Sequence, residues 1–206
     1  TIGEYLLPEQ VSAWKRQHPL SQVQLEISNT RSVLEAVAAF SVDLGFIEGS
    51  HTHPDLVVEH WLDDEMVVVA SPSHALAQQQ TVSVRQLANA GWILREAGSG
   101  TREAADRLLI PALGRVIVEM ELGSNEAVKR TVASGLGLGC LSRLAVEDAI
   151  SQGVLVSLKT RLPRLRRALA VVTHKNKPLG STAQDFLAQC RAYAPSGPGL
   201  RRASAR

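Results

Sequence analysis

Short apolar runs alternate with amphipathic helical patterns along almost the whole of this chain of 206 residues. Residues 23–28, VQLEIS, alternate apolar and polar side chains, as a half-buried strand does. Residues 32–40 carry apolar side chains at helical spacing, and the strand-like run DLGFIE follows at 43–48. Strands that alternate with helices in this way predict an α/β fold with mostly parallel sheets and right-handed crossovers.

The order of the elements predicts two subdomains. Residues 71–167 contain a strand–helix series of their own, and the last strand and helix resemble elements that return to the first half. We therefore expect one subdomain from 1–70 plus 168–194 and a second from 71–167, with a cleft between them where ligands tend to bind. The Gly-, Ser- and Arg-rich tail at 195–206 is expected to be disordered.

The composition narrows the classes of function. A net charge of +2 is too balanced to suggest that this chain grips a phosphate backbone by itself. No apolar run approaches the roughly 20 residues that a membrane helix needs, so we expect no membrane partner. Cys140 and Cys190 are isolated thiols in apolar patterns, which favours buried side chains in a reducing compartment, the cytoplasm.

The chain begins in what the pattern predicts to be the first turn of a helix. Thr1 and Glu4 fit a capping box, and Leu7, Val11 and Trp14 recur behind them at helical spacing. A helix rarely starts a fold with nothing before it to pack against. We therefore expect that a segment preceding this helix has been removed.

Four predicted helix starts carry a hydroxyl or amide side chain. Such side chains are the favoured N-caps of helices, and this structural explanation is sufficient for any one of them. The functional explanation uses the whole set, because helix N-termini gather at the carboxyl ends of strands and favour an anion there. Both explanations stay open at this point. The four segments are 1–4, 29–32, 98–101 and 123–125.

The segment GSGTRE at 98–103 is the most specific of the four. Its glycines let the backbone approach a ligand closely, and Ser99 and Thr101 add hydroxyl donors. Arg102 or Arg95 could add positive charge. The P-loop spacing G-x-x-x-x-G-K-[ST] is absent, and the later GLGLG run precedes a strand rather than following one, so no nucleotide cofactor is expected.

Other candidate sites are weaker. His51 and His53 could bind a metal but lack a nearby third ligand, and the G-x-S-x-G spacing of a nucleophile elbow is missing. The acidic residues 63–65 separate two strand-like runs and predict a solvated turn. The basic run 160–167, with four arginines, is better explained as a solvated loop than as a contact for an anionic partner. We therefore expect no enzyme activity, metal or cofactor.

The chain contains, in this order, TIGEYLLPEQVSAWKRQHP, DLGFIEG, ASPSHALA, WILREAGSGTRE, ELGSNEAVKRTVASGLGLGCLSR and FLAQC. Together these segments resemble the effector-binding domain of LysR-type transcriptional regulators, from Thr1 to about Tyr193. The resemblance implies two Rossmann-like subdomains joined by two crossover strands, as in type 2 periplasmic solute-binding proteins. It also implies that an N-terminal winged helix-turn-helix domain is absent from this chain, and that DNA is bound only through that domain.

The resemblance places a small anionic effector in the cleft between the subdomains. The turns that it implicates are the same turns that the capping argument selects. GSGTRE and ELGSNEA, with CLSR, look most similar to regulators of sulfur metabolism and carbon fixation, which suggests sulfite or a related sulfur anion. The matching residues are Thr1, Ile2, Asn29, Thr30, Ser99, Gly100, Thr101, Arg102, Ser124 and Asn125.

The resemblance also implies a homodimer, and a tetramer in the full-length protein. The first helix and the strand at 23–28 would face the helix around 125–134 of a second copy, although Trp14 could equally belong to the core. Effector binding would then shift the population of oligomer arrangements on DNA. The alternative function is a solute-binding protein of a transport system. The candidate interface residues are Gln10, Trp14, Gln17 and Lys129.

Overall fold

The computed structural model describes residues 1–193 and 199–202. Within it the chain forms two compact units. Unit 1 consists of Thr1–Asp63 with Ala168–Arg206, and unit 2 consists of Asp64–Arg167. Both units contain helices and strands, which agrees with the predicted α/β class.

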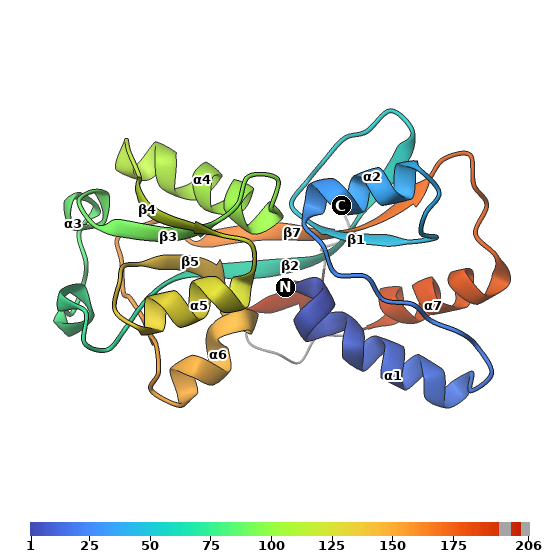
Figure 1. Ribbon diagram of the computed structural model, residues 1–206, viewed down its shortest axis with the longest axis horizontal. Helices are drawn as coiled ribbons and strands as arrows, with labels where there is room; N and C mark the ends of the chain where they lie inside the picture. The colour runs from blue at the N-terminus through green and yellow to red at the C-terminus, as the bar shows by residue number, and fades with distance from the viewer. Residues whose placement is uncertain (194–198, 203–206) are drawn as a thin grey trace. The chain divides into compact units, whose positions relative to one another are not determined.

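Both passages of the chain between the units lie inside strands. β2 (Leu56–Ala70) and β7 (Leu165–His174) each contain a unit boundary, and both are drawn in Figure 1. The sequence predicts two strands separated by a solvated acidic turn, with the crossing after residue 70. Instead β2 is one continuous strand, and the chain crosses after Asp63. The acidic residues do not end the strand because Asp64 is buried and ion-paired.

In unit 1 a short strand lies beside β7 and is covered by a helix. The helical segments of this unit are η1 (Ile2–Leu6, a π-helix), α1 (Leu7–Gln17), α2 (Thr30–Ala38) and α7 (Ser181–Ala192). β1 (Gly45–Glu48) pairs antiparallel with β7, with Gly45 opposite Val172. α2 packs against β1, and Val37 and Ile47 belong to the apolar cluster that joins them.

α1 packs against α7 around Trp14. The indole stacks on the ring of His18, with centroids 4.5 Å apart, and meets Phe186 edge-on at 5.9 Å. Trp14 is only 2% exposed. Of the two roles that the sequence leaves open for this residue, the structure shows the core role.

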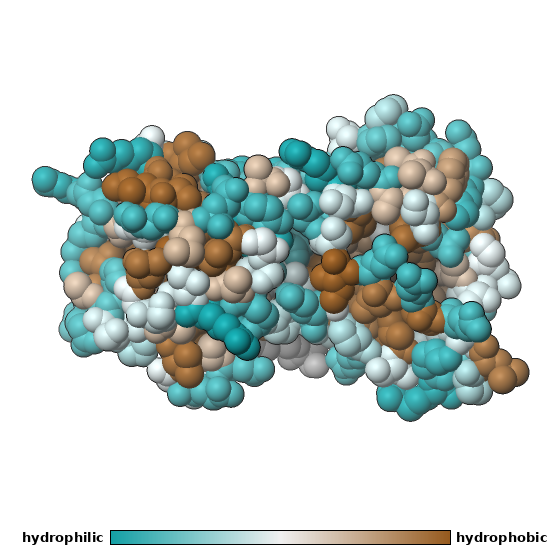
Figure 2. All heavy atoms as spheres, viewed as in Figure 1, coloured by the Kyte–Doolittle hydropathy of each residue, from teal (hydrophilic) through white to brown (hydrophobic). Residues whose placement is uncertain are grey.

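Residues 23–28 do not form the predicted strand. Val23, Leu25 and Ile27 alternate as predicted, but they are 41%, 40% and 59% exposed. A groove of about 1150 Å³ is lined both by this segment and by residues of β1. Figure 2 shows apolar surface in this region of unit 1, between α1 and α2. Among the described residues the backbone of this segment has no ladder partner.

Unit 2 contains one parallel strand pair, β3 (Gly91–Arg95) with β4 (Ile117–Leu122), joined through α4 (Gly100–Leu113). β5 (Gly139–Ser142) pairs antiparallel with the second half of β2. The prediction of mostly parallel sheets is therefore wrong, because the β1–β7, β2–β5 and β2–β6 ladders are all antiparallel. An apolar pattern fixes the face of a strand but not its direction. The remaining segments are η2 (Ala75–Gln78), α3 (Val84–Ala88), α5 (Asn125–Ala133), α6 (Arg143–Ser151) and β6 (Val156–Ser157).

Two helices pack on opposite sides of β3. Trp92 and Leu94 lie in one apolar cluster with Leu109 of α4, while Ile93 lies in another with Val128 of α5. Successive side chains of a strand point to opposite faces, so α4 and α5 cover different faces of β3. Because β3 and β4 are parallel, their carboxyl ends share one edge, and the helices that follow them begin at that edge.

The C-terminal tail is described only in part. Leu200–Arg202 forms β8, which pairs with β2, so the predicted disorder is wrong for these residues. Leu200 is buried, and burial of this apolar side chain favours an ordered strand although the neighbouring sequence is polar. The rest of the predicted tail, within 194–198 and 203–206, lies outside the described residues. Among the helices that are described, none is long and apolar enough to cross a membrane.

Both cysteines are buried. Cys140 in β5 is 2% exposed, Cys190 in α7 is 0% exposed, and both thiols are free. Burial penalises the thiolate and raises the pKa of each thiol to about 12. Both side chains therefore stay protonated at neutral pH, as small apolar residues of the core.

Because the thiolate is the reactive form of cysteine, we expect neither thiol of the native protein to react with dithionitrobenzoate at pH 8. Both should react once guanidinium chloride unfolds the chain. The raised pKa values also stabilise the fold below the ordinary thiol pKa of 9.0, and this contribution is lost as the pH rises toward 12. Rapid absorbance change from the native protein would contradict the assignment.

Candidate functional site

The segment after β3 makes a tight turn into α4. Gly98 has a φ of +88°, a left-handed conformation that favours glycine. The N–H of Ser99 donates to the Glu96 carbonyl at 3.2 Å, and the N–H of Glu103 donates to the Ser99 carbonyl at 3.0 Å. Ser99 and Thr101 are 1% and 2% exposed. Two hydroxyl-bearing residues are thus buried at the first turn of a helix of 14 residues.

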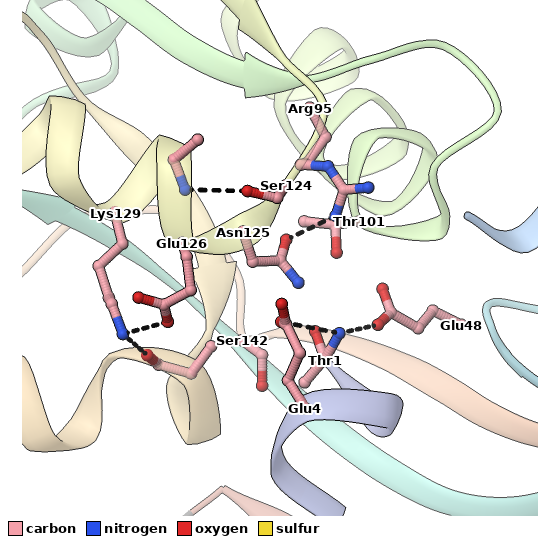
Figure 3. Close-up of polar contacts among 12 residues, drawn as sticks. Thr1, Glu4, Glu48, Arg95, Thr101, Ser124, Asn125, Glu126, Lys129 and Ser142 are labelled. Carbon is pink, nitrogen blue, oxygen red and sulfur yellow. Dashed lines mark hydrogen bonds and ion pairs between the residues drawn. The ribbon is translucent and has the colours of Figure 1, made fainter. Parts of the chain in front are cut away.

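The N-cap side chains of the predicted helix starts differ in what they do. Asn29 Oδ1 accepts a hydrogen bond from the N–H of Ser32 at 3.0 Å, at the start of α2. Ser124 Oγ accepts one from the N–H of Ala127 at 3.1 Å, at the start of α5 (Figure 3). The capping explanation is sufficient at both. Ser99, at the start of α4, makes no such cap hydrogen bond.

The predicted capping box at Thr1 does not form. Thr1 is the N-cap of η1, but its side chain makes no cap hydrogen bond to this π-helical turn. Its amino group instead lies 2.7 Å from a carboxylate oxygen of Glu48 and 3.9 Å from one of Glu4 (Figure 3). Thr30 Oγ1 contacts the backbone N–H and carbonyl of Glu48, both at 3.4 Å. Within unit 1, Thr1 and Thr30 therefore meet at the end of β1.

Arg95, the last residue of β3, joins the start of α5 to the end of β3. Its Nη1 donates to Asn125 Oδ1 at 3.0 Å, and Figure 3 shows the two side chains pointing toward one another. Its Nε and Nη2 donate to the Glu96 carboxylate at 2.7 and 2.9 Å. The charge of Arg95 is therefore balanced, and Asn125, 2% exposed, is fixed beside it.

Arg102 links α4 to both parallel strands. Its Nη1 donates to the Glu121 carboxylate at 2.6 Å and to the Arg95 carbonyl at 2.8 Å, and its Nε donates to Asp106 at 2.9 Å. Burial lowers the pKa of Arg102, but the hydrogen bonds and charges of Glu121 and Asp106 outweigh it, and the pKa is raised. Arg102 is thus a charged group whose charge is balanced inside unit 2.

A buried ion pair stands beside the Thr101 hydroxyl. Arg167 in β7 donates from Nε to Asp64 Oδ2 at 2.7 Å and from Nη1 to Thr101 Oγ1 at 2.9 Å. Ser142, at the end of β5, donates from Oγ to Asp64 Oδ1 at 2.7 Å. The side chains of Asp64 and Arg167 are 0% and 2% exposed. A continuous set of hydrogen bonds therefore runs from β5 through β2 and β7 to the first turn of α4.

Sequence reasoning missed this pair. The sequence predicts that Asp64 and Arg167 lie in solvated loops, and both predictions are wrong because both residues are buried. A signal was present, because Asp64 shares one strand face with the buried Leu62 and Met66, and Arg167 shares one with the buried Leu169. A charged residue at an inward strand position must be paired, which identifies both residues as partners in a buried contact.

The predicted site residues divide between the two units. Ile2 and Gly100 are buried, while Asn29 and Ser124 act as caps. In unit 2 the contacts of Arg95 and Arg102 bring the starts of α4 and α5 together. Unit 1 holds Thr1, Ile2, Asn29 and Thr30, and unit 2 holds Ser99, Gly100, Thr101, Arg102, Ser124 and Asn125.

Two of the predicted interface residues lie inside unit 1. Gln10 is 6% and Trp14 is 2% exposed, so their side chains do not present a surface to a second copy. Gln17 is exposed. Lys129 donates to the Ala145 carbonyl at 3.2 Å and pairs with the Glu126 carboxylate (Figure 3).

The two candidate metal ligands do not gain a third. In the residues that the structure describes, no group of three or more histidine, cysteine, aspartate or glutamate side chains is placed to hold a metal ion. His53 Nδ1 instead accepts a hydrogen bond from the N–H of Asp55 at 3.2 Å.

The model of the LysR substrate binding domain matches residues 1–195. The chain belongs to this family. The resemblance drawn from the ordered sequence segments is confirmed, and so is the fold class that it implies, that of a LysR effector-binding domain.

Two curated relatives that match most of this chain are transcriptional regulators. The chain is 43% identical over 190 residues to the uncharacterized HTH-type transcriptional regulator YeiE of Escherichia coli K12, covering 92% of this chain and 64% of YeiE. It is 33% identical over 187 residues to the HTH-type transcriptional activator CmpR of Synechocystis, covering 91% of this chain and 62% of CmpR. The chain therefore spans less than two thirds of the length of these relatives.

A solved structure agrees with this assignment. The regulatory domain of CcmR from Synechocystis PCC6803, in complex with 2-PG, matches with a TM-score of 0.84 and 29% identity. The match covers 93% of this chain and 92% of that domain.

Replacing Asp64 by Ala leaves Arg167 buried without its counter-charge. We expect the free energy of unfolding to fall by about 3–5 kcal/mol, the usual cost of removing one partner of a buried ion pair. Urea denaturation measures the change. As a control, Glu59→Gln removes the exposed pair of Glu59 with Arg191 and should cost less than about 1 kcal/mol. Similar small losses for both variants would contradict the assignment.

Proposed function

We propose that the start of α4 in unit 2 binds the effector of a LysR-type transcriptional regulator, and that this effector is a small oxyanion. Ser99 carries the proposal. It is an N-cap serine, 1% exposed, that does not cap its own helix. A serine hydroxyl that is not used to cap its helix can donate a hydrogen bond to a ligand at this position.

The surroundings of Ser99 favour a negative charge. The first turn of a helix has backbone N–H groups without intrahelical partners, and the helix dipole places partial positive charge there. α4 has 14 residues, so its dipole is fully developed, and Gly98 and Gly100 leave its first turn without side chains at these positions. Ser99 and Thr101 add hydroxyl groups. Such a site suits an oxyanion.

The charge balance of unit 2 favours a small anion held by neutral donors. Arg95, Arg102 and Arg167 are each paired with a carboxylate of the same unit. The remaining donors are hydroxyl and N–H groups, which suit an anion whose oxygens accept hydrogen bonds. Sulfite or a related sulfur anion fits this description, and the similarity of GSGTRE and ELGSNEA to sulfur-metabolism regulators supports it. The complex of CcmR with 2-PG makes 2-PG the competing candidate.

We place this binding event in a cytoplasmic, DNA-binding regulator. YeiE and CmpR are transcriptional regulators longer than this chain, and in our proposal the DNA contacts belong to parts of the protein outside it. Effector binding would shift the population of oligomer arrangements on DNA, without catalysis. A transport solute-binding protein is not favoured, because the matching family model is the LysR substrate binding domain and both YeiE and CmpR are regulators.

The oligomer in this proposal is a homodimer that forms a tetramer at full length. Gln10 and Trp14 are buried, so in this proposal unit 1 contributes the exposed Gln17 and the exposed apolar side chains of Val23, Leu25 and Ile27. Pairing with α5 of a second copy would remove these apolar side chains from water.

Isothermal titration calorimetry with sulfite, sulfate, thiosulfate, small carboxylates and 2-PG tests the site. We expect saturable binding of one anion, and at least about tenfold weaker binding by Ser99→Ala, because a hydrogen bond to a charged group contributes about 1.5–3 kcal/mol. The unfolding free energy of Ser99→Ala should change little, because the Ser99 side chain caps nothing.

Ser83 provides the matched control. It is the N-cap of α3 in the same unit, and it forms a capping box with Gln86. Ser83→Ala should lower the unfolding free energy by about 1 kcal/mol and leave anion affinity unchanged. If Ser99→Ala instead lowers the unfolding free energy and leaves the anion affinity unchanged, the proposal is contradicted. It is also contradicted if none of the ligands binds to the native chain.

A further inference from the structure

We propose that β8, the short strand Leu200–Arg202, protects an edge of β2 from pairing with β2 of a second copy of this chain. This role is independent of the anion site. It concerns the arginine-rich tail, which the proposed function leaves without a role. Three features support it: the part of β2 beside which β8 lies, the composition of that part, and the charge that β8 carries.

β8 pairs with the first half of β2. In the second half both edges of the strand are occupied, because Val69 pairs with Gly139 of β5 and also with Ser157 of β6. A residue in a strand has one neighbouring strand at each edge, so β8 has no place there. β8 also belongs to the same unit as residues 56–63. We therefore place it beside these residues, on the edge that β7 does not cover.

The first half of β2 is the kind of segment that pairs readily with another chain. Residues 56–62, LVVEHWL, are mostly apolar, contain no proline or glycine and carry one carboxylate. Val57 is 46% exposed. An open edge of such a strand presents unpaired backbone N–H and carbonyl groups, which a strand of another chain can satisfy. This edge of β2 therefore needs a cover.

β8 has the features by which proteins close the edge of a sheet. It is three residues long, and its apolar Leu200 is only 7% exposed, so this side chain anchors the strand. Arg201 is exposed and places a positive charge beside the sheet. Short edge strands and charged side chains both disfavour the addition of a further strand. β8 thus satisfies the edge of β2 and leaves a poor edge in its place.

The strand that would occupy an uncovered edge is β2 of a second copy. Two identical strands related by a two-fold axis pair antiparallel, so that each copy satisfies the same backbone groups of the other. Like charges weaken such a pair, but the one carboxylate of residues 56–62, that of Glu59, already forms an ion pair with Arg191 of α7. The uncovered edge is therefore complementary to itself.

Size-exclusion chromatography with light scattering tests this role. A chain that ends at Tyr193 lacks β8, and a chain that ends at Arg202 keeps it and serves as the matched control. We expect the control to have the same mass as the chain of 206 residues. The chain that ends at Tyr193 should have a mean mass that rises with protein concentration toward about twice that value, because two copies pair.

Val57→Lys separates pairing at the edge from a general loss of stability. A lysine at this exposed position adds a positive charge to each copy of β2, which disfavours pairing of the two edges. In the chain that ends at Tyr193 it should restore the mass of the control. It should not restore the free energy of unfolding measured by urea denaturation, because β8 is still missing.

Leu200→Asp is the second variant, for use if the chain that ends at Tyr193 does not fold. It keeps the full length and puts a carboxylate at the buried position that anchors β8, so it should cause the same rise of mass with concentration. An unchanged mass, or a rise that Val57→Lys does not reverse, would overturn the protective role. A lower free energy of unfolding without association would also overturn it, because β8 would then only stabilise unit 1.

Discussion

The ion pair between Arg167 and Asp64 is the contact on which the arrangement of unit 2 depends. The two residues are the first and last of that unit, and they join β2 to β7 where the chain enters and leaves it. Burying both charges costs several kcal/mol per ion, and such a pair persists only when further hydrogen bonds satisfy its remaining groups. Ser142 and Thr101 supply those bonds. The pair therefore ties the sheet of unit 2 to the first turn of α4.

The first turn of α4 also has an N-cap residue whose side chain does not cap the helix. Asn29, Ser83 and Ser124 use their side chains to cap their own helices, whereas Ser99 does not. Ser99 also differs from these caps in its position, because it is buried at the edge where the parallel strands β3 and β4 end. Each arginine near this edge forms an ion pair with a carboxylate; these arginines are Arg95, Arg102 and Arg167. The chemistry that remains is that of neutral donors around a small anion.

Local chemistry predicted the helix starts and the family well. Ser, Thr and Asn before apolar periodic runs marked α2, α4 and α5, because capping depends on residues only a few positions apart. Partners distant in sequence were not predictable in this way. Residues 23–28 have the alternation of a strand but no neighbour to pair with among the described residues. Asp64 was missed because its partner, Arg167, lies more than a hundred residues later.

The burial of two candidate interface residues, Gln10 and Trp14, was unpredictable for a related reason. Trp14 has the helical spacing of an exposed contact stripe and of a core stripe alike, and only α7, at the other end of the chain, decides between them. Gln10 is buried by the same packing, and its carbonyl accepts a hydrogen bond from Gln189 of α7 at 2.8 Å. The sequence therefore predicts the amphipathic helix α1, but it does not show that α7, at the other end of the chain, covers the apolar face of that helix.

Amide chemical-shift perturbation by nuclear magnetic resonance tests the central claim most directly. The account predicts that titration with sulfite, or with the anion that binds, shifts the amide signals of residues 99–102 most strongly. The signals at the start of α3, where Ser83 and Gln86 satisfy the cap themselves, should stay unchanged. Saturable binding with its largest shifts away from residues 99–102 would contradict the account, because the anion would then be held by other groups.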